Sequence, residues 1–329
     1  MRDEGAAVGA PVWASLSSRG GRADNQDRCG DTAVAGGHVF VVADGLGGHA
    51  AGAVAAEACV SATLAAAGRG ALLAPESLGA LFDAAHRAVQ EAQVRDPSAA
   101  GCRTTSVVLQ VSESRALWGH VGDTRLYHLR GGRVIAQTLD HSVPQALVQT
   151  GAIQASEIRR HPDRNRLLRS LGGEGDAAPT LLDAPVELAP GDAFLLCSDG
   201  LWEHVTEAEM EESLRGAPDP ETWLKRLEAR VLAAARGAFD NYSATAVFLG
   251  RAGAARGPVR RRGLRIVVAA LAGLCLGLAV QRCLERPSPG LVFGARSAPS
   301  LPVGEETHGS AAALRLHSTP AEPRRAGRP

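Results

Sequence analysis

Five aspartates stand where carboxylates could do chemistry, at the ends of apolar runs or in tight loops, mostly beside a glycine or an asparagine. They are Asp27 in NQDR, Asp44 in ADGLGGH, Asp123 in GDTR, Asp199 in CSDG and Asp240 in FDNYSATAVFL. Each one alone would indicate a turn, because an aspartate side chain readily hydrogen-bonds the neighbouring backbone. Asp44 and Asp199, however, both follow apolar runs and both precede a glycine, which indicates two buried strands that end in carboxylates.

A group of carboxylates gathered in one place predicts bound cations. The repulsion between several such charges would cost several kcal/mol unless cations neutralised it. No cysteine and no histidine stands at matching positions, so oxygen ligands dominate and favour Mg²⁺ or Mn²⁺ over Zn²⁺. Two such ions about 4 Å apart can share a carboxylate, lower the pKa of a bridging water and hold a phosphoryl group for in-line displacement. Residue spacing alone predicts a carboxylate-bound metal site and nothing more specific.

The elements that must position these aspartates follow from the hydrophobic pattern. Apolar residues at helical spacing predict helices over 51–67, 76–94, 143–150, 206–215 and 220–236. Runs rich in Val, Leu and aromatic residues predict strands over 38–43, 104–111, 116–121, 125–129, 133–137, 193–197 and 244–249. A Gly-Gly pair at 131–132 separates two of these strands and indicates a hairpin. Hairpin-joined strands with helices grouped apart favour an α+β fold.

Composition excludes some functional classes. Lys plus Arg equals Asp plus Glu, 35 against 35, so the chain lacks the basic surplus of a general nucleic-acid binder. The six cysteines are scattered without a CxxC pair, which is typical of buried thiols in a reducing compartment. The first residues, MRDEGAAVGAPVW, contain no apolar core of a signal peptide, so we expect a cytoplasmic catalytic body.

The chain changes character after residue 250. We expect an N-terminal extension over 1–11, a globular domain over 12–250 and a basic linker over 251–265. The apolar run that follows predicts a single membrane helix over 266–284, if arginines at its ends snorkel, although a buried or interfacial helix is the alternative. The RRRGLR sequence before it places the domain on the cytoplasmic side of the inner membrane. Residues 285–329 are rich in Pro, Ala and Arg and are expected to be disordered.

Eight segments, in order, carry a resemblance to a known family. They are SSRGGRADNQDR (17–28), FVVADGLGGHAAG (40–52), GCRTTSVVL (101–109), GHVGDTRLYHLRGG (119–132), LDHSVPQALVQTGAI (139–153), HPDRNRLLRSLGG (161–173), GDAFLLCSDGLWEHVTEAEM (191–210) and DNYSATAVFL (240–249). Together they resemble the metal-dependent serine/threonine protein phosphatases of the PPM (type 2C) family, in its bacterial form. The resemblance implies an α+β fold, in which a central two-sheet β-sandwich has helices on both outer faces.

The resemblance also implies roles at two core metal ions. Asp44 would bridge the two ions, and Gly45 would offer its backbone carbonyl to one of them. Asp199 and Asp240 would complete the shell of one ion. Asp27 would hold waters of the other ion.

Two further roles come from the same resemblance. Asp123, with Asp199, would hold a third and weaker ion. Arg22 would bind the substrate phosphate, which suits the planar fork of a guanidinium. Arg22 and Asp44 are therefore the expected catalytic residues.

Three positions depart from the family pattern. Gln26 stands where many relatives have Glu, which removes one charge and is a common variant. Arg103 replaces a usual glycine, which puts the turn at GCRTT in doubt. Leu46 stands where eukaryotic members carry a histidine proposed as general acid, so the group that protonates the leaving oxygen is unassigned.

The implied function is hydrolysis of phosphoserine and phosphothreonine on proteins by a metal-activated water, opposing a bacterial Ser/Thr kinase in signalling. We expect a monomeric catalytic domain that uses Mn²⁺ or Mg²⁺. The main alternative is a catalytically weak binding module of the same fold, which loss of Asp44, Asp199 or Asp240 would favour; all three are present. A third reading, a phosphatase of a partner-switching cascade, usually comes with sensory domains for which this chain has little room.

Overall fold

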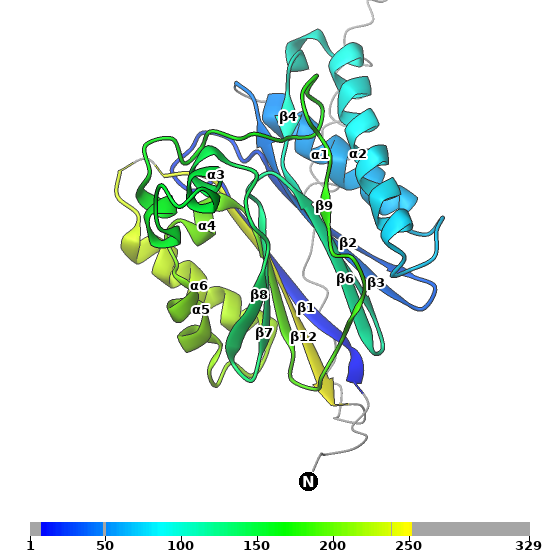
Figure 1. The fold of residues 1–329 in the computed structure, drawn as a ribbon, viewed down its shortest axis with the longest axis vertical. Coiled ribbons are helices and arrows are strands. Elements are labelled where there is room, and N and C mark those ends of the chain that lie inside the picture. Colours follow the sequence, from blue (N-terminus) through cyan, green and yellow to red (C-terminus); the bar gives the residue numbers. More distant parts are fainter. Residues whose placement is uncertain (1–7, 49–50, 238, 252–329) are drawn as a thin grey trace, which may run out of the picture. The chain divides into compact units, whose positions relative to one another are not determined.

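The computed structural model describes residues 8–48, 51–237 and 239–251 (Figure 1). The predicted linker, membrane helix and tail therefore lie outside the described residues, apart from residue 251. Within the described ranges, no helix is long and apolar enough to cross a membrane.

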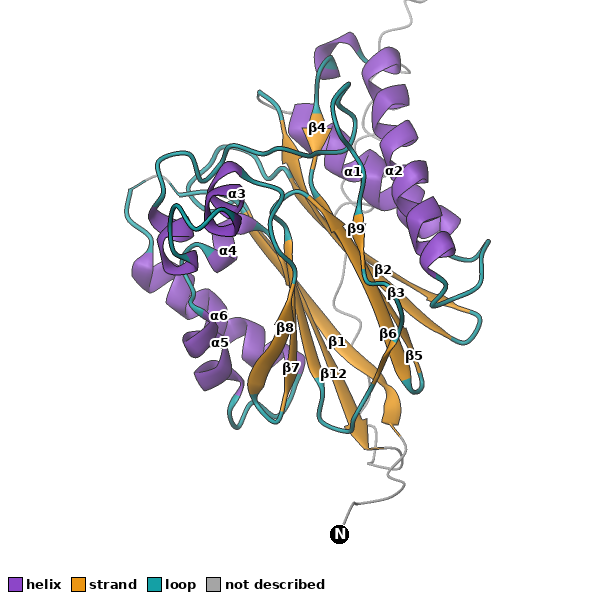
Figure 2. Cartoon of the chain, viewed as in Figure 1, coloured by secondary structure: helices purple, strands orange, loops and turns teal. Residues whose placement is uncertain are grey.

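Two antiparallel sheets form the centre of the domain (Figure 2). The first sheet has the strand order β1 (Val8–Ser18), β12 (Tyr242–Arg251), β11 (Ala193–Cys197), β7 (Arg125–Arg130) and β8 (Arg133–Gln137). The second has the order β10 (Val186–Glu187), β6 (Arg115–Val121), β5 (Ser106–Ser112), β3 (Gly37–Leu46) and β2 (Asp27–Val34). Two short strands extend it, because β4 (Arg103–Thr104) pairs with β3 and β9 (Thr180–Leu181) pairs with β6.

Helices cover the outer face of each sheet (Figure 1). Helices α1 (Ala51–Ala66) and α2 (Pro75–Arg95) pack on the second sheet, whereas α4 (Asp199–Trp202), α5 (Glu207–Leu214) and α6 (Pro220–Ala234) pack on the first. A short helix, α3 (Val143–Gln149), and the 3-10 helices η1 (Pro97–Ala99) and η2 (Ala155–Arg160) lie in the connections. The helix–sheet–sheet–helix arrangement confirms the predicted α+β sandwich.

Strand β3 shows why its sequence is a continuous apolar run. Successive side chains of a strand point to opposite faces of the sheet. Val39 and Val41 pack against α1 and α2, and Phe40 and Val42 pack between the two sheets. Because both faces of β3 are covered, side chains on both faces must be apolar. The sequence of β3 therefore lacks the alternation of apolar and polar residues that a half-exposed strand shows.

Several chain segments meet at one end of this sandwich. Asp27 begins β2 and pairs in register with Asp44 near the end of β3. Strand β6 ends at Val121, just before the Gly122–Asp123 turn, and β11 ends at Cys197, two residues before Asp199. The antiparallel order thus places the predicted aspartates on neighbouring strand ends.

Candidate metal centre

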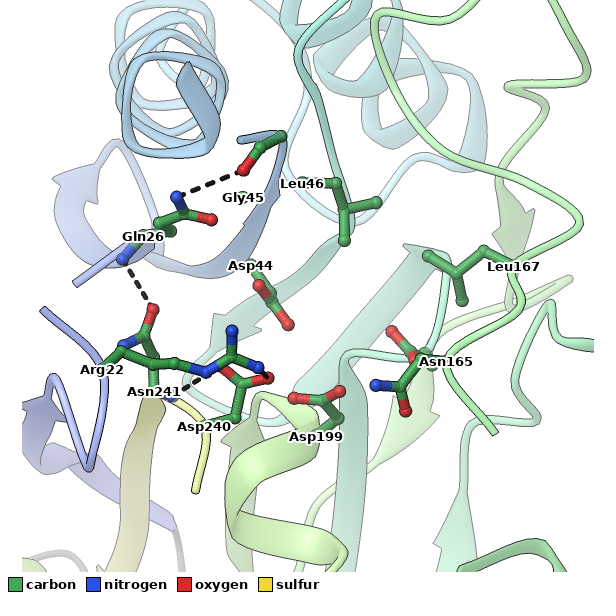
Figure 3. A pocket seen from close by; sticks show the side chains of 12 residues that line it. Arg22, Gln26, Asp44, Gly45, Leu46, Asn165, Leu167, Asp199, Asp240 and Asn241 are labelled. Atoms are coloured by element: carbon green, nitrogen blue, oxygen red, sulfur yellow. Dashed lines mark hydrogen bonds and ion pairs between the residues drawn. The ribbon is translucent and has the colours of Figure 1, made fainter. Parts of the chain in front are cut away.

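A cavity of about 200 Å³ lies at this end of the domain (Figure 3). Four of the five predicted aspartates line it, together with the other two predicted site residues: Asp44, Asp123, Asp199, Asp240, Gly45 and Arg22. The fifth, Asp27, does not line the cavity but is buried beside it as the register partner of Asp44. The structure therefore brings all seven predicted residues to one place, while their individual roles stay predictions.

Asp27 is held by one oxygen and leaves the other unpaired. Its side chain is 1% exposed, and the hydroxyl of Ser198 donates to Oδ2 at 2.6 Å. The Ser198 hydroxyl is itself fixed, because it accepts a hydrogen bond from the backbone N–H of Ser243 at 3.0 Å. Oδ1 of Asp27 is buried without a hydrogen-bond partner. Burial, as the largest cause, raises the pKa of Asp27 to about 6.

Asp44 and Asp199 are crowded by other carboxylates. Burial raises the pKa of both residues well above the usual aspartate value, and the charges of neighbouring aspartates raise it further. Oδ1 of Asp199 is also buried without a partner. An anion that is removed from water and surrounded by like charges is unfavourable until a cation joins it.

The backbone of Asp44 is fixed by the strand beside it. Its carbonyl accepts hydrogen bonds from the Thr105 N–H at 2.9 Å and from the Thr104 hydroxyl at 2.8 Å. Arg103 and Thr104 form β4, which pairs with Leu46 and Gly45 of β3. The replacement of glycine by Arg103 is therefore accommodated in an extended conformation.

Asp123 follows the turn after β6. Burial raises the pKa of Asp123 to about 7, and the charge of Asp140 adds to the shift. Gly122, which precedes it, has a φ of 95°, a left-handed conformation that glycine adopts without strain.

These residues fit hard divalent cations. The donors are carboxylate oxygens, two of which are buried and unpaired, and burial disfavours their charges without a counter-ion. In the described part of the chain, no three His, Cys, Asp or Glu side chains are arranged to hold one ion by themselves. The oxygen donors at the cavity suit Mg²⁺ or Mn²⁺, because hard cations prefer oxygen ligands.

Arg22 stands at the exposed side of the cavity. Its Nη2 donates to Oδ2 of Asp240 at 2.8 Å, and 56% of its side chain is exposed. The loop that carries Arg22 is anchored by Asn241, whose amide donates to the carbonyls of Arg19 and Asp24 and whose Oδ1 accepts from the Gln26 N–H. The sequence gives no role for Asn241; its position directly after Asp240 is the only signal.

The remaining wall includes two residues that sequence reasoning missed, Asn165 and Leu167 (Figure 3). They belong to HPDRNRLLRSLGG, a segment recognised only as part of the family pattern. Leu46 also lines the cavity, so the position of the eukaryotic histidine holds an apolar side chain. No histidine lines the cavity in the described ranges, and the proton donor to the leaving oxygen stays unassigned.

Comparison with known proteins decides the family. The family model described as Protein phosphatase 2C matches residues 17–236. The chain belongs to the protein phosphatase 2C family.

The chain is also similar to individual bacterial phosphatases and to solved structures. The serine/threonine protein phosphatase PstP of Mycobacterium tuberculosis is 36% identical over 212 residues, which are 62% of this chain and 38% of PstP. The serine/threonine phosphatase stp of Listeria innocua is 37% identical over 183 residues, covering 54% of this chain and 71% of that protein. A crystal structure of the PstP catalytic domain in complex with two manganese ions superposes with a TM-score of 0.63 at 31% identity, covering 74% of this chain and 99% of that one.

Proposed function

We propose that this protein phosphatase 2C chain is an active, metal-dependent phosphatase that hydrolyses phosphoserine and phosphothreonine on proteins. The observation that carries the proposal is one cavity lined by four aspartates, with Asp27 buried beside it and an exposed arginine at its edge. Asp27, Asp44, Gly45, Asp199 and Asp240 would hold two core ions of Mn²⁺ or Mg²⁺. Asp123, with Asp199, would hold a third.

The chain's own residues would bind and orient the phosphoryl group. Divalent ions, when bound, would supply Lewis-acid stabilisation of phosphoryl oxygens and lower the pKa of a water. Arg22 would bind two phosphate oxygens through its guanidinium, which its contact with Asp240 holds beside the cavity. The fixed backbones of Asp44 and Asp123 would keep the carboxylates in place throughout the reaction, so that little reorganisation is needed.

The alternative of a catalytically weak binding module has no observation in its favour. All the carboxylates that the family pattern requires are present and lie at the cavity. The relatives named above are called phosphatases rather than regulatory modules.

Substrate and location are further parts of the proposal. The relatives' names point to phosphoserine and phosphothreonine proteins as substrates, and we infer that a cognate Ser/Thr kinase phosphorylates them. From the sequence we also infer that 266–284 anchors the chain in the membrane. Recovery of the full chain in the membrane fraction, and its release when 266–284 is deleted, would test the anchor.

The direct test of activity uses the full-length chain with p-nitrophenyl phosphate and a phosphothreonine peptide. Turnover should require Mn²⁺ or Mg²⁺, and both EDTA and Asp199→Asn should abolish it. A phosphotyrosine peptide of the same sequence should be a much poorer substrate. Absence of turnover from folded, manganese-loaded protein would overturn the proposal.

A further inference from the structure

We propose that Trp202 is a positioning residue of the metal centre, because its buried indole fixes the Asp123 turn relative to Asp199. The inference rests on the proposed metal-dependent function of the same site. Trp202 ends α4, the short helix that begins with Asp199, and its side chain is fully packed, with 1% of the residue exposed. Its Nε1–H donates to the backbone carbonyl of Asp123 at 2.9 Å.

The indole is also held on its face. The guanidinium carbon of Arg125 lies 3.5 Å from the centroid of the Trp202 ring. Arg125 is fixed in turn by two hydrogen bonds to Asp140, both of 2.7 Å, and both side chains are buried. Asp123 and Arg125 are two residues apart, so one short segment contacts the ring both at its N–H edge and on its face.

The backbone of Trp202 and the far side of the turn are restrained as well. The carbonyl of Trp202 accepts a hydrogen bond from Nε of Arg159 at 2.8 Å. Gly122 exchanges two hydrogen bonds with His141: its carbonyl accepts from the His141 N–H, and its own N–H donates to Nδ1. The peptide on either side of the Asp123 Cα is therefore fixed, by His141 before it and by Trp202 after it.

This geometry assigns more than packing to Trp202. A large apolar side chain could fill the same space, but only an N–H donor fixes the orientation of the Asp123 carbonyl. Rotation of that peptide would swing the Asp123 carboxylate away from Asp199, and metal ligands need positions accurate to about 0.5 Å. Without the indole N–H, the Asp123 turn and α4 should still pack together, but the site that contains Asp123 and Asp199 should bind metal less well.

Trp202→Phe tests this, because phenylalanine keeps an aromatic face for Arg125 and lacks the N–H donor. Calorimetric titration of the metal-free full-length chain with Mn²⁺ should show the weakest binding step weakened by roughly 10-fold, the lower limit for losing a partner that orients a metal ligand. The Mn²⁺ concentration for half-maximal turnover should rise in parallel, with kcat at saturating Mn²⁺ nearly unchanged.

Trp223→Phe is the matched control. Trp223 is also fully buried, and its indole Nε1 lies 3.3 Å from the Met210 carbonyl oxygen and 3.1 Å from the Ser213 hydroxyl; none of these three residues lines the cavity. Trp223→Phe should reduce thermal stability as much as Trp202→Phe does, but should leave Mn²⁺ binding unchanged. If both variants weaken Mn²⁺ binding equally, Trp202 acts through general stability and the inference is wrong.

A double-mutant comparison identifies the residue through which Trp202 acts. In an Asp123→Asn background, Trp202→Phe should weaken Mn²⁺ binding no further, because the ligand that it positions is already lost. Additive effects would overturn the inference. Calorimetry also separates the inference from the proposed function. Mn²⁺ binding that depends on Trp202, in a protein without turnover, would support the positioning role and refute the phosphatase activity. Turnover together with unchanged Mn²⁺ binding in Trp202→Phe would support the phosphatase activity and refute the positioning role.

Discussion

The side chain of His141 helps to restrain the turn that carries Asp123, and it accepts the Gly122 N–H only when its Nδ1 is unprotonated. Nδ1 accepts a hydrogen bond from the Gly122 N–H at 3.1 Å, and Nε2 lies 2.8 Å from the Thr180 hydroxyl. Burial, assisted by the nearby His120 and Arg169, lowers the pKa of His141 to about 3. The imidazole is therefore neutral across the physiological range of pH.

This gives a pH prediction for His141→Asn, in which the side-chain amide does not titrate. Because the pKa of His141 is lower in the folded chain than its ordinary value of 6.5, the unfolded chain binds the extra proton. The contribution of His141 to stability is thus complete above about pH 6.5 and falls as the pH decreases toward 3. Urea unfolding at pH 7.5 and pH 5.5 should show that the wild type loses more free energy of unfolding than the variant does. Equal losses would contradict the prediction.

At the residue scale, the sequence indicated the seven candidate residues but not the residues that support them. The five aspartates stand in short local patterns that indicate strand ends and turns, whereas Arg22 and Gly45 were indicated only by the resemblance of their segments to the family. Ser198, Asn241 and Trp202 act through hydrogen bonds to residues 79 to 222 positions away. No local pattern can reveal such contacts, because they exist only once the sheets have packed.

At the scale of elements, the close approach of the end of β3 to the start of α1 depends on Gly45. A Cβ added to Gly45 would lie 2.0 Å from the Gly52 carbonyl oxygen and 2.8 Å from the Gln26 carbonyl oxygen. These neighbours are backbone atoms, which cannot move aside without displacing α1 or the loop before β2. The site therefore requires glycine here for close packing, whether or not its carbonyl binds a metal.

Gly45→Ala should accordingly destabilise the domain by at least 1–3 kcal/mol, the usual range for overpacking, and should weaken Mn²⁺ binding. Gly48→Ala, three residues later, is the control, because nothing lies within 4 Å of its added Cβ. Thermal unfolding should show a fall of roughly 2–4 °C per kcal/mol for Gly45→Ala and almost no change for Gly48→Ala. If the two variants unfolded at the same temperature, the close approach would not limit this position.

The predicted bounds agree with the structure where the local sequence pattern determines the element, and strands were missed where pairing with a neighbouring strand determines it. Strands β8 and β11 were predicted with the bounds they have, and helices α1, α2 and α6 within two residues. Strands β1 and β2 were not predicted, since β1 contains Pro11 and small residues and β2 has few large apolar residues. Both lie at the edges of their sheets, where pairing with β12 and β3 rather than intrinsic propensity creates the strand.

At the scale of the whole molecule, the sandwich gathers like charges that the metal-free fold must bear. Asp27, Asp123 and Asp199 are buried and Asp44 is half-buried, and removal from water is the largest cause of the raised pKa of each. The fold tolerates them because the cores on both sides of each sheet are continuous and apolar. Stability and metal binding are thus opposed in this domain, as is common for functional sites.

Asp199→Asn should therefore make the metal-free protein more stable, although it should abolish activity. Removal of one buried, like-charged carboxylate relieves repulsion, and a gain of about 1 kcal/mol would raise the melting temperature at pH 8 by roughly 2–4 °C. Mn²⁺ should stabilise the wild type by mass action and stabilise the variant much less. Asp183→Asn, at an exposed position, should leave the melting temperature unchanged both without metal and with Mn²⁺. If the metal-free variant melted below the wild type, hydrogen bonds within the fold would already stabilise the carboxylates. Cations would then not be needed to offset the cost of burying their charge.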